Sequence, residues 1–421
     1  MVGNRLVDSG ALDLFGALAA AARGRSALVA MRGGERSRAL KVMAKALRVA
    51  QNDILEANTL DLEASREKAN SGLPLLWIKF TPDRLQRVAD MLDRLADLPD
   101  PIRQAIRATH QTQNLQSYCQ LMPLGTIALV YEGLPELGAI AAGMGIKTGN
   151  SMILYGSGET KHTNAAIASA LVDGLTAGDL PPECVTAIPS DRDISMRDLV
   201  AQERYLNLIV AYGRPKLVQQ VSQFATVPVL GAAIGNCYLY WALSGELDVV
   251  RWSICDSHQG DPEAVNAIEK VLVHERHNRS MLGVLFGSLQ TDGFEVRVDD
   301  HLQQDFPDLP LAGDDEWSRP YLTKTVAFRT VASVEEAIAV IHTHSSGHAD
   351  CIATESYREA HQFASRLDSA STYINASPRF QRNPRGSASV FLGMSNQKGY
   401  RRGAIGLDML TTIKQIVQGD G

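Results

Sequence analysis

The chain has 421 residues, of which 45% are hydrophobic and 21% are charged. This composition is typical of a folded, soluble protein and excludes an intrinsically disordered one. The formal net charge of −6 is mild, so no global field attracts the protein to nucleic acid or to an anionic membrane. A single hydrophobic core stops growing well below this length, and we therefore expect two globular units.

The start of the chain and its cysteines indicate the compartment. The sequence MVGNRLVDSG has no apolar run after a basic end, so it does not predict a signal peptide. The longest nearly uncharged run, at 137–146, is shorter than the roughly 20 apolar residues that span a bilayer. The cysteines are scattered and lack the spacing of metal ligands. We expect a cytoplasmic protein without a membrane segment and without a bound metal. The five cysteines are Cys119, Cys184, Cys237, Cys255 and Cys351.

The first half of the chain predicts helices followed by a wound sheet. Apolar residues recur three and four positions apart between 12 and 70, and again at 82–98, which indicates amphipathic helices. Short apolar runs then predict strands, with helical patterns at 160–175 and 214–224 between them. This alternation predicts a parallel sheet with helices on both faces. The predicted strands are 126–131, 152–155, 185–188, 206–212 and 227–230.

The second half predicts another α/β unit. The run VVRWSIC at 249–255 is interpreted as a buried strand, and the Pro- and Asp-rich stretch at 301–320 as a surface loop. Trp241 and Trp252 flank the predicted join between the units, where aromatic core is expected. The remaining predicted elements are helices at 262–277 and 334–343, and strands at 281–286, 294–298 and 325–330.

Several segments together resemble the γ-glutamyl phosphate reductase family, also called glutamate-5-semialdehyde dehydrogenase, a branch of the aldehyde dehydrogenase superfamily. The resemblance runs in order from about Glu35 to the C-terminus, and IKTGN (146–150) and YINASPRF (373–380) carry it most specifically. Further matching segments lie at 122–160, 227–241, 265–275, 348–356 and 395–414.

The resemblance implies an α/β fold of the aldehyde dehydrogenase type. It implies N-terminal helices and a Rossmann-type cofactor domain over 1–253, with an oligomerisation segment near 108–125. It places a catalytic-type α/β domain at 254–385, and a C-terminal oligomerisation strand and helix that return to the first domain at 386–421. The implied activity is the NADPH-dependent reduction of γ-glutamyl phosphate to glutamate semialdehyde in proline synthesis, through a thioester on a cysteine.

The residues at the implied reaction centre differ from the family's. Val265 stands directly before Asn266, where the family carries its nucleophilic cysteine, and an alkyl group has no lone pair with which to form a thioester. Glu136 takes the oxyanion position, where a carboxylate opposes the developing negative charge. We therefore predict that catalysis is impaired.

The implied cofactor positions have changed as well. Tyr155 takes the place of a cation near the cofactor's ribose and phosphate, and a tyrosine does not neutralise a phosphate. Arg214 stands in a turn that is glycine-rich in the family, and its bulk hinders the approach of the cofactor to the following helix. We therefore predict that NADP binding is weakened. The implied cofactor-binding positions are Lys147, Tyr155, Tyr212, Gly213, Arg214 and Phe391.

Three functional hypotheses follow. The first is a homologue with little or no catalysis that acts as a binding or assembly protein, as a homo-oligomer or with a protein partner from proline or glutamate metabolism. The alternative is an active NADPH-dependent reductase that uses another nucleophile, such as Cys255, or direct hydride transfer. The third, a nucleic-acid binder, is opposed by the acidic net charge. Its only support is a basic run at Arg379, Arg382, Arg385, Lys398, Arg401 and Arg402.

Two groups of histidines have competing interpretations. His258 and Asp256 suggest acid–base work or a metal, but two titratable groups in a loop usually face solvent, and no third ligand stands at a suitable spacing. His344, His348 and Asp350 form the densest imidazole cluster, which we interpret as structural, with zinc binding as the alternative. Cys237 is interpreted as core.

Overall fold

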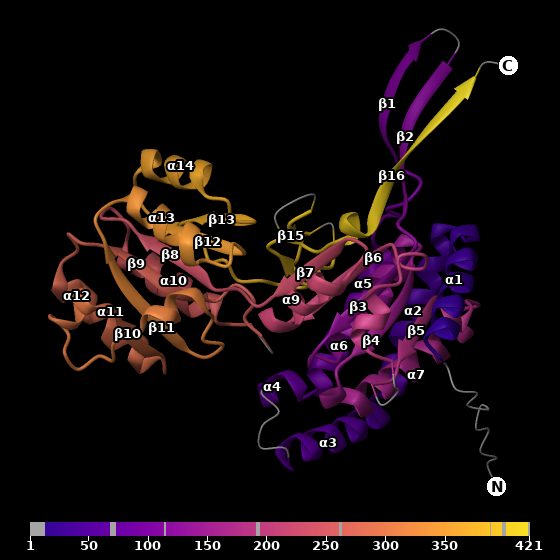
Figure 1. Cartoon of the computed structure of the whole chain (residues 1–421), viewed down its shortest axis with the longest axis horizontal. Helices are drawn as coiled ribbons and strands as arrows, with labels where there is room; N and C mark the ends of the chain where they lie inside the picture. The colour runs from indigo at the N-terminus through magenta and orange to yellow at the C-terminus, as the bar shows by residue number, and fades with distance from the viewer. Residues whose placement is uncertain are drawn as a thin grey trace. The chain divides into compact units, whose positions relative to one another are not determined.

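The computed structural model describes two compact units (Figure 1). Unit 1 comprises Met1–Gly231, Arg382–Leu392 and Ile405–Gly421, and unit 2 comprises Ala232–Gln381 and Gly393–Ala404. The division after Gly231 falls before the predicted boundary at 253. The residues described within these units are 13–67, 73–112, 115–190, 194–260, 263–387, 389–397 and 401–419.

A five-stranded sheet with the strand order β5-β4-β3-β6-β7 forms the centre of unit 1. β3 pairs in parallel with β4 and β6, and β4 pairs in parallel with β5. The predicted strands of this half are confirmed, and their apolar runs are buried because helices cover the sheet. The strands are β3 (Thr126–Tyr131), β4 (Ser151–Gly156), β5 (Val185–Ile188), β6 (Leu208–Gly213) and β7 (Val229–Ala233).

The longer helices surround this sheet in the way that the apolar periodicity predicts, with the exception of α6. The apolar side of α1 packs into a core with the strands, and α2 packs against α5 and α7. α6 was not predicted, because all of its residues are buried and it carries no polar stripe. The helices are α1 (Leu14–Ala30), α2 (Gly33–Val49), α3 (Gln51–Glu67), α4 (Leu75–Ile78), α5 (Pro82–Asp97), α6 (Glu136–Thr148), α7 (Lys161–Ala177), α8 (Met196–Val200) and α9 (Pro215–Phe224), with 3-10 turns η1 (Gly158–Thr160) and η2 (Pro182–Cys184).

Unit 1 also carries a separate antiparallel sheet of three strands. Its order is β1-β2-β16, and β16 pairs with β2 from Thr411 opposite Pro123 to Gly419 opposite Leu115. Figure 1 shows the three strands running side by side away from the five-stranded sheet. In the C-terminal segment the structure has a strand, as predicted, but only a 3-10 turn in place of the predicted helix. The elements are β1 (Ala105–Thr112), β2 (Leu115–Pro123), η4 (Leu407–Leu410) and β16 (Thr411–Gly419).

Unit 2 is built on a six-stranded parallel sheet with the order β10-β11-β9-β8-β12-β13. One apolar core includes residues of α10 and α11, and another includes residues of α13 and α14. The elements are β8 (Cys237–Trp241), α10 (Leu247–Ser257), β9 (Ile268–His274), α11 (Arg279–Thr291), β10 (Glu295–Val298), α12 (Asp300–Gln303), η3 (Asp314–Ser318), β11 (Thr325–Val331), α13 (Val334–His344), β12 (Ala349–Ala353), α14 (Tyr357–Arg366), β13 (Ser371–Ile374), β14 (Met394–Ser395) and β15 (Gly403–Ala404).

Three sequence predictions in unit 2 were wrong. The predicted helix at 262–277 contains the strand β9, the predicted strand at 281–286 lies inside α11, and the predicted strand at 249–255 lies inside α10. Short apolar runs in buried elements do not distinguish a helix from a strand. Because α10 packs into the core of unit 2, this unit begins earlier than predicted. Trp252 is 51% exposed on α10, so the prediction that it belongs to the core was also wrong.

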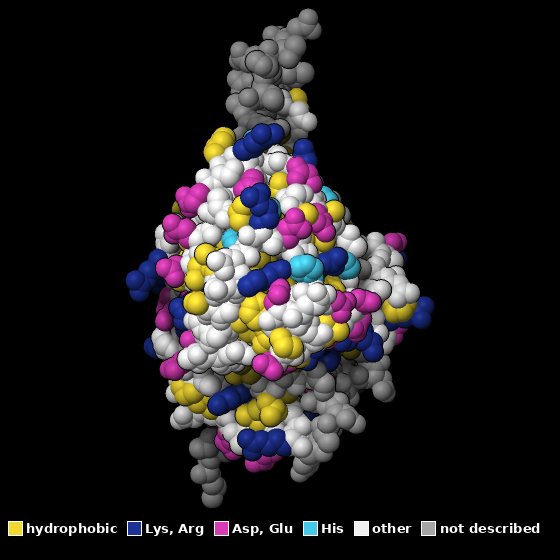
Figure 2. All heavy atoms as spheres, turned by 90° about the vertical axis from the view of Figure 1, so that its left-hand side faces the viewer, with side chains coloured by type: hydrophobic (Ala, Val, Ile, Leu, Met, Phe, Trp, Pro, Cys, Tyr) yellow, Lys and Arg dark blue, Asp and Glu magenta, His cyan; other side chains and the backbone are white. Residues whose placement is uncertain are grey.

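Two observations concern the binding of membranes and of nucleic acids. None of the helices in the described ranges is long and apolar enough to cross a membrane. On the face of unit 2 drawn in Figure 2, basic and acidic side chains are interspersed, without a broad area of one sign. Such a mixed face does not attract a polyanion to itself.

Substitution of two glycines tests how closely the N-terminal helices pack. A Cβ atom at Gly24 in α1 would stand 2.3 Å from the carbonyl oxygen of Glu183, whereas one at Gly34 in α2 has no heavy atom within 4 Å. We expect Gly24→Ala to lower the free energy of unfolding by about 1–3 kcal/mol through overpacking. We expect Gly34→Ala to raise it by about 0.5 kcal/mol, since alanine favours the helix. Denaturant unfolding measures both, and equal effects would contradict the close contact at Gly24.

Candidate functional site

The carboxyl edge of the unit 1 sheet gathers most of the predicted site residues. β3, β4 and β6 end at this edge, and α6, α7 and α9 begin there, because each helix follows its strand in a parallel sheet. Wound sheets of this kind bind ligands at such an edge. Glu132, Glu136, Tyr155 and the turn 212–214 all lie there.

Glu132 and Arg214 form the central ion pair of this edge. The carboxylate oxygen Oε1 of Glu132 accepts hydrogen bonds from the backbone N of Arg214 at 2.5 Å and from its Nε at 2.9 Å, and Oε2 accepts from Nη2 at 2.9 Å. Glu132 is 8% exposed. The hydrogen bond from Arg214 to Glu132 raises the pKa of the Arg214 guanidinium above its ordinary value. The Glu132 carboxylate thus binds Arg214, which is the N-cap residue of α9.

Glu136 is paired rather than isolated. It begins α6, and its carboxylate accepts a hydrogen bond from Arg84 Nε at 3.2 Å and further bonds from Arg84 Nη2. Glu136 is 5% exposed and Arg84 is 3% exposed. The guanidinium compensates the negative charge that the sequence analysis assigned to the oxyanion position. Repulsion of a developing oxyanion by Glu136 is therefore weaker than the residue type alone predicts.

Two tyrosines at the cofactor positions are engaged inside unit 1. Tyr155 OH donates to the carbonyl oxygen of Ile194 at 3.0 Å. Tyr212 is 1% exposed, and its hydroxyl accepts a hydrogen bond from Arg382 Nη2 at 2.8 Å. Phe391 donates its backbone N–H to the carbonyl oxygen of Arg382 at 2.8 Å. These contacts fix the segment 382–391 to the end of β6.

Lys147 lies at the other end of α6, away from this edge. Its ammonium is buried and donates to Ser37 Oγ at 3.1 Å and to the carbonyl oxygens of Ala96 and Leu98. Burial lowers the pKa of Lys147. The structure does not bring this residue together with the other cofactor positions. Its contacts show a packing role, because they join α6 to the end of α5 and to α2.

Arg214 and Tyr155, two of the predicted cofactor positions at this edge, do not fit the diphosphate of an NADP cofactor. The backbone N of Arg214 and its guanidinium are held by Glu132, and Tyr155 brings no positive charge. A pocket of about 170 Å³ lies at the ends of β4 and β5, below the range of roughly 300–1,000 Å³ typical of ligand pockets. One buried oxygen at this pocket, Asn164 Oδ1, has no hydrogen-bond partner among the described residues. The pocket is lined by Tyr131, Leu154, Lys161, Asn164, Ile188 and Ser190 among others.

In unit 2, Val265 lies in the loop before β9. It is 1% exposed, and its carbonyl oxygen accepts a hydrogen bond from Gly235 N at 2.9 Å. Asn266 is also 1% exposed and donates from Nδ2 to the carbonyl oxygen of Pro378 at 3.0 Å. Asn266 Oδ1 has no hydrogen-bond partner in the part of the chain that the structure describes. The loop thus holds a buried polar atom beside the alkyl side chain.

Two thiols are relevant to the nucleophile position. Cys237 Sγ and Val265 O both lie 2.8 Å from the position that a Cβ atom would take at Gly235, so Cys237 stands at this loop. Burial raises the pKa of the Cys237 thiol well above its ordinary value. Cys255 lies on α10, and burial and a hydrogen bond to Asp292 raise its pKa. Neither thiol has the lowered pKa of an activated nucleophile.

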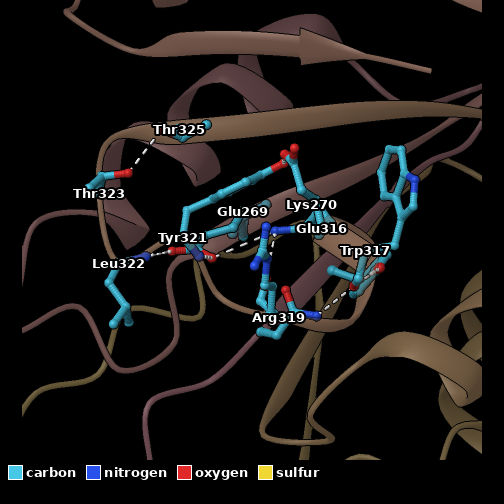
Figure 3. A network of polar contacts seen from close by, with 12 residues as sticks. Glu269, Lys270, Glu316, Trp317, Arg319, Tyr321, Leu322, Thr323 and Thr325 are labelled. Carbon is cyan, nitrogen blue, oxygen red and sulfur yellow. Dashed lines mark hydrogen bonds and ion pairs between the residues drawn. The ribbon is translucent and has the colours of Figure 1, made fainter. Parts of the chain in front are cut away.

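A buried charged pair close to Val265 was missed by the sequence analysis (Figure 3). Glu269 accepts hydrogen bonds from the backbone N of Tyr321 at 2.5 Å and of Leu322 at 2.9 Å. Lys270 Nζ lies 3.7 Å from Glu269 Oε2 and 3.6 Å from the centre of the Tyr321 ring. Burial raises the pKa of Glu269 and lowers that of Lys270, and their attraction opposes both shifts. The sequence carries a signal for this pair, because two charged residues interrupt the apolar run IEKVLV at 268–273.

The predicted basic run is largely paired. Arg379 Nη1 lies 3.3 Å from Asp256 Oδ1 in unit 2, and Arg402 Nη1 lies 2.7 Å from Asp368 Oδ1 in the same unit. Arg382 donates to Tyr212, as described above. Lys398 lies outside the described residues.

The predicted histidine groups are part of the framework of unit 2. Asp350 is fully buried and accepts hydrogen bonds from Tyr238 N and Ser345 Oγ, both at 2.9 Å. His348 is also fully buried, whereas His344 pairs with Ser318 Oγ at 2.8 Å. Among the described residues, no three His, Cys, Asp or Glu side chains gather as metal ligands would.

The buried histidines predict a dependence of stability on pH. Burial lowers the pKa of His258 and of His348 from 6.5 to about 4. Between these values the two imidazoles bind protons in the unfolded chain but not in the folded one, so their contribution to the free energy of unfolding falls as the pH falls through this window. Asp350, whose pKa burial raises to about 6, and Glu269, whose pKa burial also raises, bind protons in the folded chain within the same window and oppose the effect. The contribution of one histidine is therefore measured by removing it.

We expect lowering the pH from 7 to 5 to change the urea midpoint less favourably in the wild-type protein than in His258→Gln. Glutamine keeps an N–H for the carbonyl oxygen of Ile268, which His258 Nε2 meets at 3.0 Å, but it does not titrate. Equilibrium urea unfolding of both proteins at both pH values measures the difference. An equal change of the midpoint in the variant would show that His258 does not contribute.

The chain is similar to known reductases along nearly its whole length. It is 51% identical over 414 residues to γ-glutamyl phosphate reductase 2 of Synechocystis sp., covering 98% of this chain and 99% of that protein. It is 35% identical over 401 residues to the γ-glutamyl phosphate reductase of Gloeobacter violaceus, covering 95% and 96%. No protein-family model matches the chain.

Solved structures agree with this similarity. The γ-glutamyl phosphate reductase of Thermotoga maritima superposes with a TM-score of 0.89 at 30% identity, covering 97% of this chain and 98% of that one. An acetylating aldehyde dehydrogenase from Geobacillus thermoglucosidasius shares the fold, with a TM-score of 0.71 at 15% identity and coverage of 97% and 96%. The predicted α/β fold of the aldehyde dehydrogenase type is confirmed. The chain therefore belongs to the γ-glutamyl phosphate reductase family.

Proposed function

We propose that this chain reduces γ-glutamyl phosphate to glutamate 5-semialdehyde, with NADPH as the reductant. One observation carries the proposal: the chain is 51% identical, over 98% of its length, to a protein named γ-glutamyl phosphate reductase 2. The names of the relatives favour this activity over the catalytically impaired protein that the sequence analysis predicted. The impairment has no support from these similarities.

The residue at position 265 limits the chemical route. Reduction of an acyl phosphate replaces the bond between the carbonyl carbon and phosphate with a C–H bond and releases phosphate. Val265 offers no lone pair, so a thioester cannot form there. The proposal therefore requires a different nucleophile or none. Cys237 is the first thiol to test, because it stands at the same loop, although its raised pKa disfavours the thiolate.

A second candidate function is binding or assembly without turnover, as a homo-oligomer or with a protein partner from proline or glutamate metabolism. The observation that favours it is the engagement of the site residues with one another. Glu132 holds Arg214, Arg84 holds Glu136, and Val265 is buried without a reactive group. A site of this kind retains its shape while its polar groups stay paired within the chain.

The reverse reaction distinguishes the two candidates. We expect wild-type protein, given glutamate semialdehyde, phosphate and NADP, to produce NADPH at a rate that depends on phosphate. If Cys237 is the nucleophile, Cys237→Ser abolishes this rate while Cys255→Ser does not. The absorbance of NADPH measures it.

Val265→Cys supplies a positive control, since it places a thiol at the family's position. Turnover in Val265→Cys together with none in wild type would contradict the reductase proposal and favour the binding protein. Turnover that survives in both serine variants would indicate a route without a thiol intermediate.

We also propose that the chain forms a homo-oligomer through its three-stranded sheet. β1 and β16 are the outer strands of this sheet, and outer strands leave backbone groups available to another chain. Ile413 and Val417 on β16 are 47% and 57% exposed, and they share one face of the strand because they lie four residues apart.

We expect Ile413→Lys with Val417→Lys to lower the mass that light scattering measures, because two charges oppose an apolar contact. Val49→Lys is a matched control, since Val49 is 78% exposed at the end of α2 in the same unit. A wild-type protein that is monomeric at micromolar concentration would contradict the proposal.

A further inference from the structure

The N-terminus of α9 is occupied by the chain's own carboxylate. We propose that Glu132, held in place by Arg214, excludes the phosphates of a dinucleotide from this position, so that the native chain binds NADPH weakly. The inference concerns binding by unit 1 and holds whether or not the chain turns over substrate.

The backbone at this terminus has few donors left for a phosphate. Anions bind at helix N-termini through the N–H groups that lack a partner within the helix. Here the N–H of Arg214 donates to Glu132, and Pro215 has no N–H. The N–H groups of Leu217 and Val218 both donate to the carbonyl oxygen of Arg214. An incoming phosphate would therefore have to displace Glu132 to gain the Arg214 amide.

In the turn before α9, Gly213 leaves room for the side chain of Glu132. A Cβ atom at Gly213 would stand 2.5 Å from Glu132 Cγ and 2.8 Å from its Oε1, so a side chain at this position would force Glu132 to shift. A glycine at the end of a strand usually lets a ligand approach the backbone closely. In this chain the absent side chain leaves room for a carboxylate. The backbone N of Glu132 also donates to the carbonyl oxygen of Tyr212 at 3.2 Å, which ties the end of β3 to the end of β6.

Charge adds to the exclusion. The carboxylate of Glu132 is 8% exposed, so solvent screens it poorly, and a phosphate beside it would meet a fixed negative charge. Arg214 is the cation that is placed to bind a phosphate, but its Nε and Nη2 both donate to Glu132. The Glu132 carboxylate thus compensates the positive charge that Arg214 brings to the turn. Removing the charge of Glu132 while keeping its shape should release the guanidinium for an anion.

The test measures binding of NADPH to the full chain by nicotinamide fluorescence and by calorimetry. We expect Glu132→Gln to bind NADPH at least about tenfold more tightly than wild type, since Arg214 then pairs with a phosphate. The double variant Glu132→Gln with Arg214→Ala should lose this gain. Adenosine, which has no phosphate, should bind Glu132→Gln and wild type equally.

Asp100→Asn is the matched control. It also removes one carboxylate charge from a two-oxygen pair with an arginine in unit 1, since Arg36 Nη2 meets both Asp100 oxygens at 2.9 and 2.8 Å. It should leave NADPH binding unchanged. Glu132→Ala replaces Glu132→Gln if thermal unfolding shows that the glutamine variant does not fold. The proposal is overturned if removal of the carboxylate leaves NADPH binding no tighter, or if adenosine binding tightens as much.

Discussion

Charged groups that leave water need partners inside the protein, and this constraint sets the form of the candidate site. Three buried glutamates, Glu132, Glu136 and Glu269, stand at the ends of strands or helices, and each is held by a cation or by backbone N–H groups. An uncompensated charge at any of these positions would be costly, because the surrounding apolar core cannot solvate it. The pairs therefore fix the loops that join the elements, and they leave fewer polar groups for a ligand.

The segments that resemble the family most closely serve the framework as well as the site. Within IKTGN, Lys147 joins α6 to neighbouring helices, and Asn150 accepts from Gly125 N and donates to the carbonyl oxygen of Leu410. Gly149 ends α6 in the left-handed region, at φ 75°. These contacts belong to the shared fold, and a fold and its site are separable.

Much of the fold of unit 1 followed from the sequence, because its strands alternate with helices that have a clear polar side. α5 is an example: Leu85, Val88, Leu92 and Leu95 lie on one buried face. The signal failed where an element is buried all round. α6 has no polar stripe, α10 and the apolar run of α11 resemble strands, and the charges of Glu269 and Lys270 made β9 resemble a helix. In such segments periodicity carries little information.

The sequence by itself determined the family, the two-unit α/β organisation, and a valine at 265, where the resemblance predicts the nucleophile. These are properties of local pattern and of residue identity. Only the tertiary structure decided which groups meet. Glu132 and Arg214 are far apart in the chain, as are Arg84 and Glu136, and no spacing rule predicts such pairs. The first pair arises because the parallel sheet brings the ends of β3 and β6 to one edge, and the second arises because α5 packs against α6, which Glu136 begins.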